Sequence, residues 1–205
     1  MARYQYEPFP YVTPPELAGD GSTGAPVIIV GAGPIGLAAA IDLATHGVAS
    51  IVVDDNNVVS VGSRAICWAK RSLEIFDRLG IGERMLAKGV TWKLGRVYRG
   101  DEEVYNFDLL PEDGHRFPAF INLQQYYAEE YLVDRVREFD DIDLRWRNKV
   151  VGLTTRFDGA TLEIETPDGA YTLDADWVIA ADGARSQVRR LMGLDFMGRV
   201  FEDRF

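Results

Sequence analysis

The sequence predicts an α/β fold in which a parallel sheet is covered by helices. Two short all-apolar runs, residues 27–30 and 51–53, have the length and composition of buried parallel strands. An Ala- and Leu-rich segment, residues 34–46, lies between them and is predicted to be a helix with Leu37 and Ile41 on its buried face. Strand, helix and strand in this order form a βαβ unit, the building block of parallel sheets.

Composition and charge exclude several classes of protein. The chain has 205 residues, of which 47% are apolar and 26% charged, so disorder of the whole chain is excluded. It carries 22 Lys and Arg against 32 Asp and Glu, and a formal charge of −10 argues against nucleic-acid or anionic-membrane binding. One cysteine, Cys67, and two histidines, His46 and His115, exclude an internal disulfide, a cysteine cluster and a His-rich metal site. Neither a run of about 20 apolar residues nor a signal-peptide core is present, so a reducing, cytoplasmic setting is the default expectation.

The first 26 residues differ from the rest of the chain because they hold five of its nine prolines. Such a segment is not expected to form a helix or a central strand. Two alternatives remain. The favoured one is a disordered tail, and the other is an extended arm that lies over the domain through Tyr4, Tyr6, Phe9 and Tyr11.

Beyond the βαβ unit, helical spacing predicts further helices, and turn signals between alternating residues predict strands. Gly100-Asp101 marks a hairpin, and Asp158-Gly159 and Pro167-Asp168-Gly169 mark the turns of a β-meander. Residues 177–180 form another all-apolar run, predicted to be a separate buried strand, and Ser186 is the expected N-cap of a short helix after it. We predict helices over 65–79, 82–88 and 123–139, hairpin strands over 92–99 and 103–109, a loop over 111–118, a strand from Ile142, and the meander over 149–174.

The segment Gly31-Ala32-Gly33-Pro34-Ile35-Gly36 has the form of a dinucleotide-binding fingerprint, placed directly after a strand and at the start of a helix. Gly31 is expected to form the tight turn, Gly33 to let the backbone approach a pyrophosphate, and Gly36 to allow close packing of helix on strand. Asp54 ends the second strand, where a carboxylate accepts hydrogen bonds from an adenosine ribose. A glycine-rich turn without a ligand is the competing interpretation, which the complete strand–loop–helix–strand–acid context disfavours.

Two further motifs have both a structural and a functional interpretation. Asp182-Gly183 follows the strand predicted at 177–180, so Asp182 is either part of an ordinary strand–turn–helix or a cofactor contact at the carboxyl edge of the sheet. Asn122 and Gln125 have the spacing of a capping box, and local sequence alone favours that interpretation over a ligand contact by Gln125.

Together these motifs resemble the class A flavoprotein monooxygenases, the FAD-dependent aromatic hydroxylases related to p-hydroxybenzoate hydroxylase. The similarity is greatest to the phenol and 3-(3-hydroxyphenyl)propionate hydroxylase branch. The glycine-rich loop with Asp54 resembles the ADP-binding motif of that family, and Asp182-Gly183 resembles its Asp-Gly motif, which touches FAD and is implicated in NAD(P)H use. Gln125, with Glu129 four residues later, resembles a helix start whose Gln contacts the flavin nucleotide. Because the three motifs occur together, the resemblance favours a ligand contact by Gln125 over the capping box.

The resemblance implies a Rossmann-like FAD-binding fold with a parallel sheet, a β-meander and part of a substrate-domain sheet. It implies a βαβ unit over 27–90, a substrate-domain hairpin over 91–121 and a continued FAD-binding domain over 122–205. It also implies a flavin-contacting Arg64 and an adenine contact at the backbone of Val150. One departure is Asp55, where the family commonly has a basic residue. The implied cofactor contacts are Gly31, Ala32, Gly33, Pro34, Ile35, Gly36, Val53, Asp54, Asp55, Arg64, Gln125, Val150, Asp182 and Gly183.

The implied chemistry is reduction of FAD by NADH or NADPH, capture of O₂ as a flavin C4a-hydroperoxide, and transfer of one oxygen atom to a small phenolic or other aromatic substrate. The cofactor performs the difficult step, so no catalytic acid or base is assigned, and His115 is interpreted as a solvated loop residue. The Gly-Asp-Ala-x-His segment that completes the family's flavin site is absent, since Gly19-Asp20 and Gly100-Asp101 are not followed by Ala and His. The chain is therefore expected to be an N-terminal portion.

Other functions stay open from sequence. A disulfide reductase of similar fold needs a redox cysteine pair, which a single Cys67 excludes, and a plain NAD dehydrogenase leaves Gln125 and Asp182 unexplained. An FAD-dependent reductase or halogenase shares the fold, and a nucleotide-binding fragment without turnover is a non-enzymatic alternative. The oligomeric state, with a homodimer among the alternatives, is also open.

Overall fold

A computed structural model gives the fold of residues 4–19, 24–62, 64–199 and 201–202, which are the residues that the structure describes. Strands and helices alternate at the start of the chain, as the sequence predicts. In chain order the elements are β1 (Ala25–Val30), α1 (Pro34–Thr45), β2 (Ser50–Asp54), β3 (Cys67–Ala69), α2 (Lys70–Arg78), α3 (Gly82–Lys88), β4 (Val90–Thr91), β5 (Leu94–Arg99), β6 (Glu102–Asp108), β7 (Phe120–Asn122), α4 (Gln125–Val136), β8 (Ile142–Trp146), β9 (Lys149–Arg156), β10 (Gly159–Thr166), β11 (Gly169–Ala180) and α5 (Gln187–Leu191).

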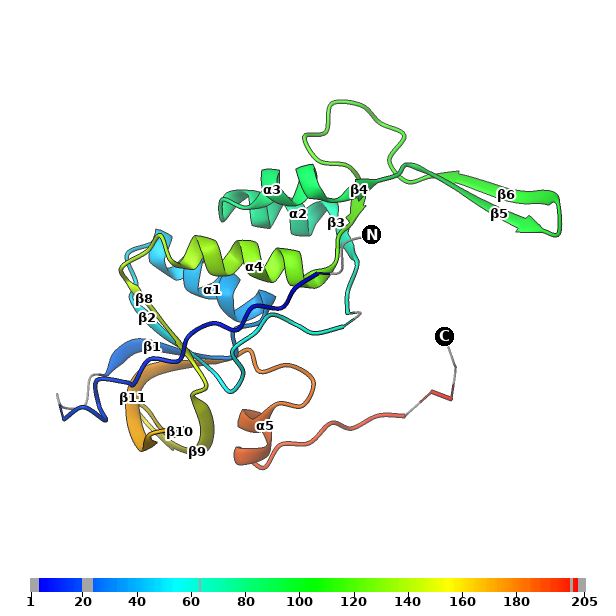
Figure 1. Cartoon of the computed structure of the whole chain (residues 1–205). Helices are drawn as coiled ribbons and strands as arrows, with labels where there is room; N and C mark the ends of the chain where they lie inside the picture. Colours follow the sequence, from blue (N-terminus) through cyan, green and yellow to red (C-terminus); the bar gives the residue numbers. More distant parts are fainter. Residues whose placement is uncertain (1–3, 20–23, 63, 200, 203–205) are drawn as a thin grey trace.

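The main sheet joins a parallel half to an antiparallel half in the strand order β8-β2-β1-β11-β10-β9 (Figure 1). The strands β8, β2, β1 and β11 run parallel, whereas β11, β10 and β9 form the predicted meander. The prediction of two separate strands, one ending near Asp174 and one at 177–180, is wrong because β11 is a single strand. Asp174 and Asp176 look like a boundary in the sequence, but they alternate with the buried Leu173 and Ala175 and leave the strand unbroken.

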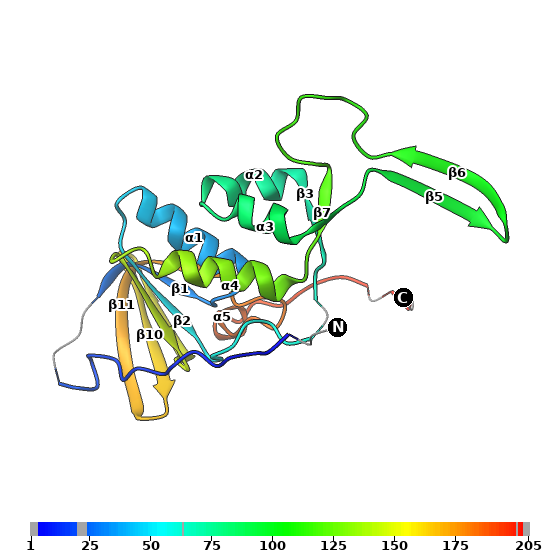
Figure 2. The same cartoon turned by 45° about the horizontal axis from the view of Figure 1, so that its top comes forward.

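Helices cover one face of the parallel half, and the meander together with α5 covers the other, so the central strand β1 is buried on each side. The adjacent residues Ile28 and Ile29 of β1 are both fully buried and belong to different cores, as the all-apolar run predicts. The helices α1 and α4 lie together on one face with α2 and α3 beyond them, and α5 lies on the other face beside β9 (Figures 1 and 2). Leu37 of α1 and Leu132 of α4 are fully buried in the first core. Among the described helices, none is long and apolar enough to span a bilayer.

A small three-stranded sheet, β3-β7-β4, corrects the boundaries of two predicted helices. The helix predicted from residue 65 begins at Lys70, because Trp68 pairs with Ile121 in the sheet and donates its indole N–H to the carbonyl of Leu123 over 2.7 Å. The helix predicted over 123–139 spans only the residues of α4, since residues 120–122 belong to β7. Trp68 is thus a buried residue of the strand β3.

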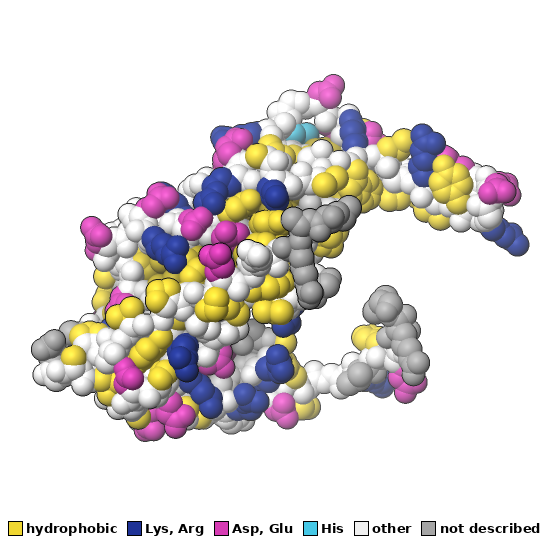
Figure 3. All heavy atoms as spheres, in the orientation of Figure 1, with side chains coloured by type: hydrophobic (Ala, Val, Ile, Leu, Met, Phe, Trp, Pro, Cys, Tyr) yellow, Lys and Arg dark blue, Asp and Glu magenta, His cyan; other side chains and the backbone are white. Residues whose placement is uncertain are grey.

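The strands β5 and β6 form the predicted hairpin, which projects away from the main sheet as a ribbon of two strands (Figures 1 and 2). Apolar side chains gather along it (Figure 3), and Val97, Val104 and Tyr105 are about half exposed. Trp177 of β11 is also exposed, at 72%, which corrects the prediction that residues 177–180 are fully buried.

The N-terminal arm, residues 4–19, lies along the body of the molecule (Figure 1), in the manner of the extended-arm alternative. Tyr4 packs 4.0 Å from the ring of Tyr126, and Phe9 stacks on Trp146 at 4.6 Å. The arm is shorter than expected because Pro26 belongs to β1, where proline is tolerated at the beginning of a strand. The proposed domain boundaries otherwise stay predictions.

Candidate functional site

A cleft of about 760 Å³ lies at the carboxyl ends of β1, β2 and β11. Ligands of open α/β sheets bind at this edge, and the volume falls within the range of small-molecule pockets, roughly 300–1,000 Å³. Segments far apart in the sequence meet there. The lining residues are Val30, Gly31, Gly33, Pro34, Ile35, Val53, Asp54, Asp55, Ser60, Gln125, Glu129, Asn148, Lys149, Val150, Ala181, Asp182, Gly183, Arg185, Gln187 and Arg190.

The three glycines of the loop after β1 meet different physical requirements, and those of Gly31 and Gly36 agree with the sequence prediction. Gly31 has φ of +107° and donates its N–H to the carbonyl of Val53 over 2.8 Å, which makes the tight turn. A Cβ on Gly36 would lie 1.9 Å from the carbonyl oxygen of Gly31, so helix and loop touch at this point. A Cβ on Gly33 would meet nothing within 4 Å, because this glycine faces the open cleft.

Gly33 is also the N-cap of α1, and no side chain caps this helix. The helix starts with Pro34 and has no acidic residue in its first turn. The N–H groups of Ile35 and Gly36 therefore lie at a positive helix end beside the cleft, which suits an anion such as a phosphate.

The Asp54 carboxylate is held at the end of β2 by two backbone N–H groups. Its Oδ2 accepts from Ala32 at 2.6 Å and its Oδ1 from Asn56 at 2.8 Å. Burial raises the pKa of Asp54 above its usual value, the two N–H groups oppose that rise, and the charges of Asp55 and Glu129 add to it. Each carboxylate oxygen has a second lone pair, so Asp54 is fixed in direction and still able to accept from a ligand hydroxyl.

Asp182 fastens the turn after β11 to the short helix α5. Its Oδ2 accepts from the N–H of Val188 at 3.0 Å, and Gly183 follows with φ of +73°. Ser186 is the N-cap, as predicted, and accepts from the N–H of Arg189 at 3.0 Å. The strand–turn–helix interpretation is therefore confirmed, and Asp182 also lines the cleft, where its contact with a cofactor stays a prediction.

Gln125 is not part of a capping box. It is the first residue of α4, and Asn122 lies in β7, so the spacing that suggested the box spans a strand and a helix. The Gln125 amide donates from Nε2 to Glu129 Oε1 at 2.6 Å and to Ser60 Oγ at 3.1 Å. Glu129, only 3% exposed, also accepts from the N–H and hydroxyl of Ser60, which ties α4 to the loop after β2.

Most of the predicted cofactor contacts come together in the cleft. Three do not line it: Ala32 and Gly36 support it from behind, and Arg64 is an exposed residue outside it. Cys67 is exposed in β3, and His115 is exposed beside the Lys70 ammonium, with 2.8 Å between Nζ and Nδ1. The role of each residue in binding stays a prediction.

Sequence reasoning missed the cationic part of the cleft and the residues that brace it. Lys149, Arg185 and Arg190 line the cleft and give it positive charge beside its acidic residues. Arg185 and Arg190 lie two and seven residues after Gly183, so arginines spaced along the segment after the Asp-Gly turn were the available signal. No signal in the sequence pointed to Asn148, because tertiary contacts bring this residue to the cleft.

Comparison with known proteins agrees with this geometry. A family model described as FAD binding domain matches residues 24–202. A flavin-dependent monooxygenase of Mycobacteroides abscessus is 34% identical over 86% of this chain and 38% of its own length. The pentachlorophenol 4-monooxygenase of Sphingobium chlorophenolicum is 30% identical over 89% of this chain and 34% of its own length.

Solved structures give the same result. The p-nitrophenol 4-monooxygenase of Pseudomonas putida DLL-E4 matches 88% of this chain and 46% of its own, with a TM-score of 0.81 and 30% identity. A flavin-dependent monooxygenase solved with FAD and substrate matches 86% of this chain and 33% of its own, with a TM-score of 0.76 and 30% identity. The chain thus spans less than half the length of these relatives. On the match over residues 24–202, this chain belongs to the FAD binding domain family.

Proposed function

We propose that this chain is the FAD-binding part of an NAD(P)H-dependent flavoprotein monooxygenase that hydroxylates a phenolic or other aromatic substrate. The observation that carries the proposal is the meeting of the glycine loop, Asp54, Gln125 and Asp182 around one cleft. A plain NAD site accounts for the first two only. Relatives named as monooxygenases of nitrophenol and pentachlorophenol support the aromatic substrate class.

The cleft fits the adenosine diphosphate part of FAD. The uncapped start of α1 beside the open face of Gly33 suits the pyrophosphate. Asp54 would accept from the ribose, and Val150, which also lines the cleft, would lie beside the adenine. Lys149 and Arg190 add positive charge toward the phosphates.

Bound FAD supplies the redox chemistry, taking a hydride from NADH or NADPH and using O₂ to deliver one oxygen atom to the ring. The residues of this chain bind and orient the cofactor. Gln125 and Asp182 both line the cleft, and each is fixed by a hydrogen bond to another segment, Gln125 to Ser60 in the loop after β2 and Asp182 to Val188 of α5. Rigid walls of this kind hold a cofactor in one orientation toward its substrate.

We assign the hairpin β5–β6 to the substrate side of the protein. It stands apart from the cofactor cleft and presents exposed apolar residues, among them Val97, Val104 and Tyr105 (Figure 3). An aromatic substrate and its enclosing sheet need apolar surface of this kind.

The decisive experiment uses the purified full-length protein. We expect bound flavin with absorbance near roughly 450 nm and NAD(P)H oxidation that a phenol stimulates and that yields hydroxylated product. Parallel assays with NADH and NADPH identify the reductant. Protein that binds NAD(H) but no flavin would refute the proposal. Flavin reduction without hydroxylation would indicate a reductase, and halide-dependent product would indicate a halogenase.

A matched pair of variants links the activity to the cleft. Asp54→Asn removes the charge that we assign to the ribose, so FAD retention should fall. Asp140→Asn changes an exposed carboxylate outside the residues that line the cleft, so FAD retention should stay at the wild-type level.

A further inference from the structure

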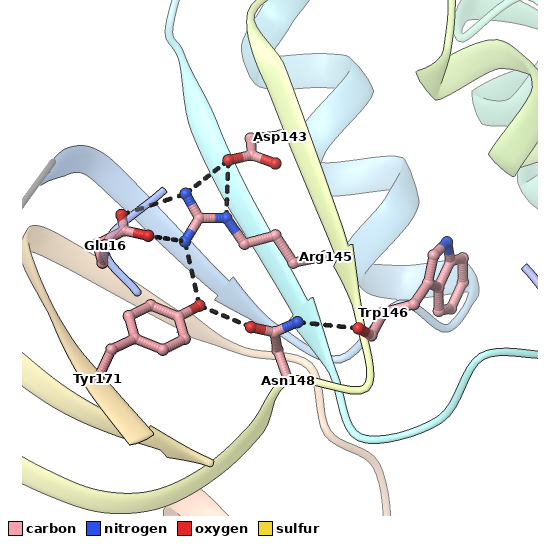
Figure 4. Close-up of polar contacts among 6 residues, drawn as sticks. All are labelled: Glu16, Asp143, Arg145, Trp146, Asn148 and Tyr171. Carbon is pink, nitrogen blue, oxygen red and sulfur yellow. Dashed lines mark hydrogen bonds and ion pairs between the residues drawn. The ribbon is translucent and has the colours of Figure 1, made fainter. Parts of the chain in front are cut away.

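The N-terminal arm reaches the interior of the molecule through a buried ion pair. Glu16 and Arg145 of β8 are only 4% and 6% exposed at their side chains. The guanidinium donates to both carboxylate oxygens of Glu16, over 2.9 and 3.3 Å (Figure 4). Burying two charges costs about as much free energy as their attraction returns, so such a pair is weak evidence for stability and better evidence for a fixed geometry.

Arg145 continues the contact toward the cofactor cleft. Its guanidinium also donates to Asp143 over 2.7 Å and to the Tyr171 hydroxyl of β11 over 3.1 Å. Tyr171 in turn donates to Oδ1 of Asn148 over 2.7 Å. Burial raises the pKa of Tyr171 to about 12, so its hydroxyl keeps the proton that this second bond needs.

Asn148 stands between this network and the cleft. It is 1% exposed, lines the cleft, and donates from Nδ2 to the carbonyl of Trp146 over 2.9 Å (Figure 4). Its backbone N–H donates to the carbonyl of Asp54 over 2.8 Å. A continuous set of hydrogen bonds therefore runs from Glu16 in the arm to the residue that we assign to the ribose.

A second, independent contact joins the arm to the same turns. Phe9 stacks on Trp146 at 4.6 Å. It exchanges two hydrogen bonds with Asn57, one from its N–H to the Asn57 carbonyl at 2.7 Å and one from the Asn57 amide to its own carbonyl at 3.0 Å. The turn after β2 and the turn after β8 are thus both held by the arm, and these turns form the adenosine side of the cleft.

We propose that the arm is a positioning latch: Glu16, through Arg145, Tyr171 and Asn148, sets the adenosine side of the cleft and thereby the affinity for the ADP part of the cofactor. The inference rests on the proposed FAD function and goes beyond it. None of the four residues is assigned a contact with the reacting atoms.

The test compares three variants of the full-length protein stripped of cofactor. Glu16→Gln removes the charge that holds Arg145, and Tyr171→Phe removes the hydroxyl that joins Arg145 to Asn148. Thr13→Ala is the matched control, because Thr13 is an exposed arm residue that bonds Asp168 over 2.6 Å outside the network. Dissociation constants for ADP and for FAD are measured by calorimetry at a temperature where circular dichroism shows each variant folded.

We expect Glu16→Gln and Tyr171→Phe each to raise the dissociation constants for ADP and for FAD by the same factor. That factor should be about tenfold, the size of a typical coupling between residues of one network. Thr13→Ala should leave both constants unchanged. Equal losses for ADP and FAD place the effect at the adenosine end. A lowered melting temperature with unchanged ADP affinity in the folded variants overturns the latch and leaves a structural role.

The binding measurements distinguish a failure of the latch proposal from a failure of the proposed FAD function. Wild-type protein that binds ADP and FAD, with variants that bind equally well, overturns the latch alone. Wild-type protein that binds neither overturns both proposals. If Glu16→Gln does not fold, Tyr171→Phe decides the question, since it leaves the ion pair intact.

Discussion

The parallel half of the main sheet and the hairpin β5–β6 follow opposite physical rules. The strands β2, β1 and β11 of the parallel half each pair with two neighbours, and Ile28 and Ile29 of the central strand β1 are inaccessible to solvent. The hairpin has one partner per strand and exposes Val104 and Tyr105. An isolated two-stranded ribbon is marginally stable, and gathered apolar residues on a surface mark a contact site. The parallel half therefore has a core of its own, whereas the hairpin leaves apolar surface uncovered.

The largest loss of stability is expected from a substitution at Gly36, where the loop after β1 touches α1. Gly36→Ala would place a Cβ 1.9 Å from a backbone oxygen, and backbone cannot move as a side chain can. We expect a loss of more than about 3 kcal/mol of unfolding free energy, measured by denaturant titration. Gly33→Ala is the control, since its Cβ meets open space: stability should persist while FAD affinity falls. Equal stability of both variants contradicts the assigned division of roles.

A truncation in each region compares them directly. Leu132→Ala in α4 removes a fully buried side chain and should cost about 3 kcal/mol of unfolding free energy. Val104→Ala in β6 removes a half-exposed one and should change it by no more than about 0.5 kcal/mol. Chemical denaturation of both variants measures the difference. A large loss at Val104 would show that the hairpin is already packed against a surface.

The pH dependence of cofactor affinity comes next in size. Ionised Asp54 accepts hydrogen bonds from a ligand hydroxyl more strongly than the protonated acid does, so cofactor affinity should be highest above the pKa of Asp54 and should fall as pH drops through it. Because burial raises that pKa, the loss should begin at a higher pH than for an ordinary Asp. Asp54→Asn should weaken ADP by about tenfold at neutral pH and flatten this profile. Titration calorimetry across acidic pH measures both, and an unchanged profile in the variant would remove Asp54 from the site.

The smallest effect concerns α5. Ser186→Ala removes the N-cap that accepts from Arg189 and should cost about 1 kcal/mol of unfolding free energy. Ser186→Asp, which keeps an acceptor at the N-cap, is the matched control and should restore it. Thermal melting of both variants tests this. No difference between the two would mean that Asp182, through Val188, fixes the helix by itself.

The parts of the fold that depend on local pattern could be predicted from sequence. The βαβ unit, the hairpin, the meander and the cap of α5 follow from apolar period and turn residues, which act over short distances. The strand β3 could not be predicted, because a Trp-containing run with helical spacing adopts a strand only when residues 120–122 pair with it. The same reason applies to β11, whose length is set by its neighbours β1 and β10.

The candidate site also contains residues that the sequence could indicate and residues that depend on tertiary contacts. The glycine loop, Asp54 and Asp182 have residue types that their positions require, so the sequence could point to them. The capping-box interpretation of Gln125 failed because spacing alone does not show that a strand ends between Asn122 and the helix. The sequence offered the docked arm only as the less favoured alternative, and it could not identify the partners of Phe9 and Glu16, since Trp146 and Arg145 lie more than a hundred residues away.

Because β11 belongs to both the parallel half and the meander, the main sheet can be completed only late in synthesis. Val30 of β1 pairs with Ala180 of β11, 150 residues later in the chain. At a synthesis rate of about 5–20 residues per second, the apolar edge of β1 waits roughly 8–30 s for its partner. Such distant pairing slows folding and leaves an edge open to aggregation. The strand that closes the sheet also delivers Asp182, so the cleft is completed as this edge is covered, and ribosome-associated chaperones should matter most before residue 180 emerges.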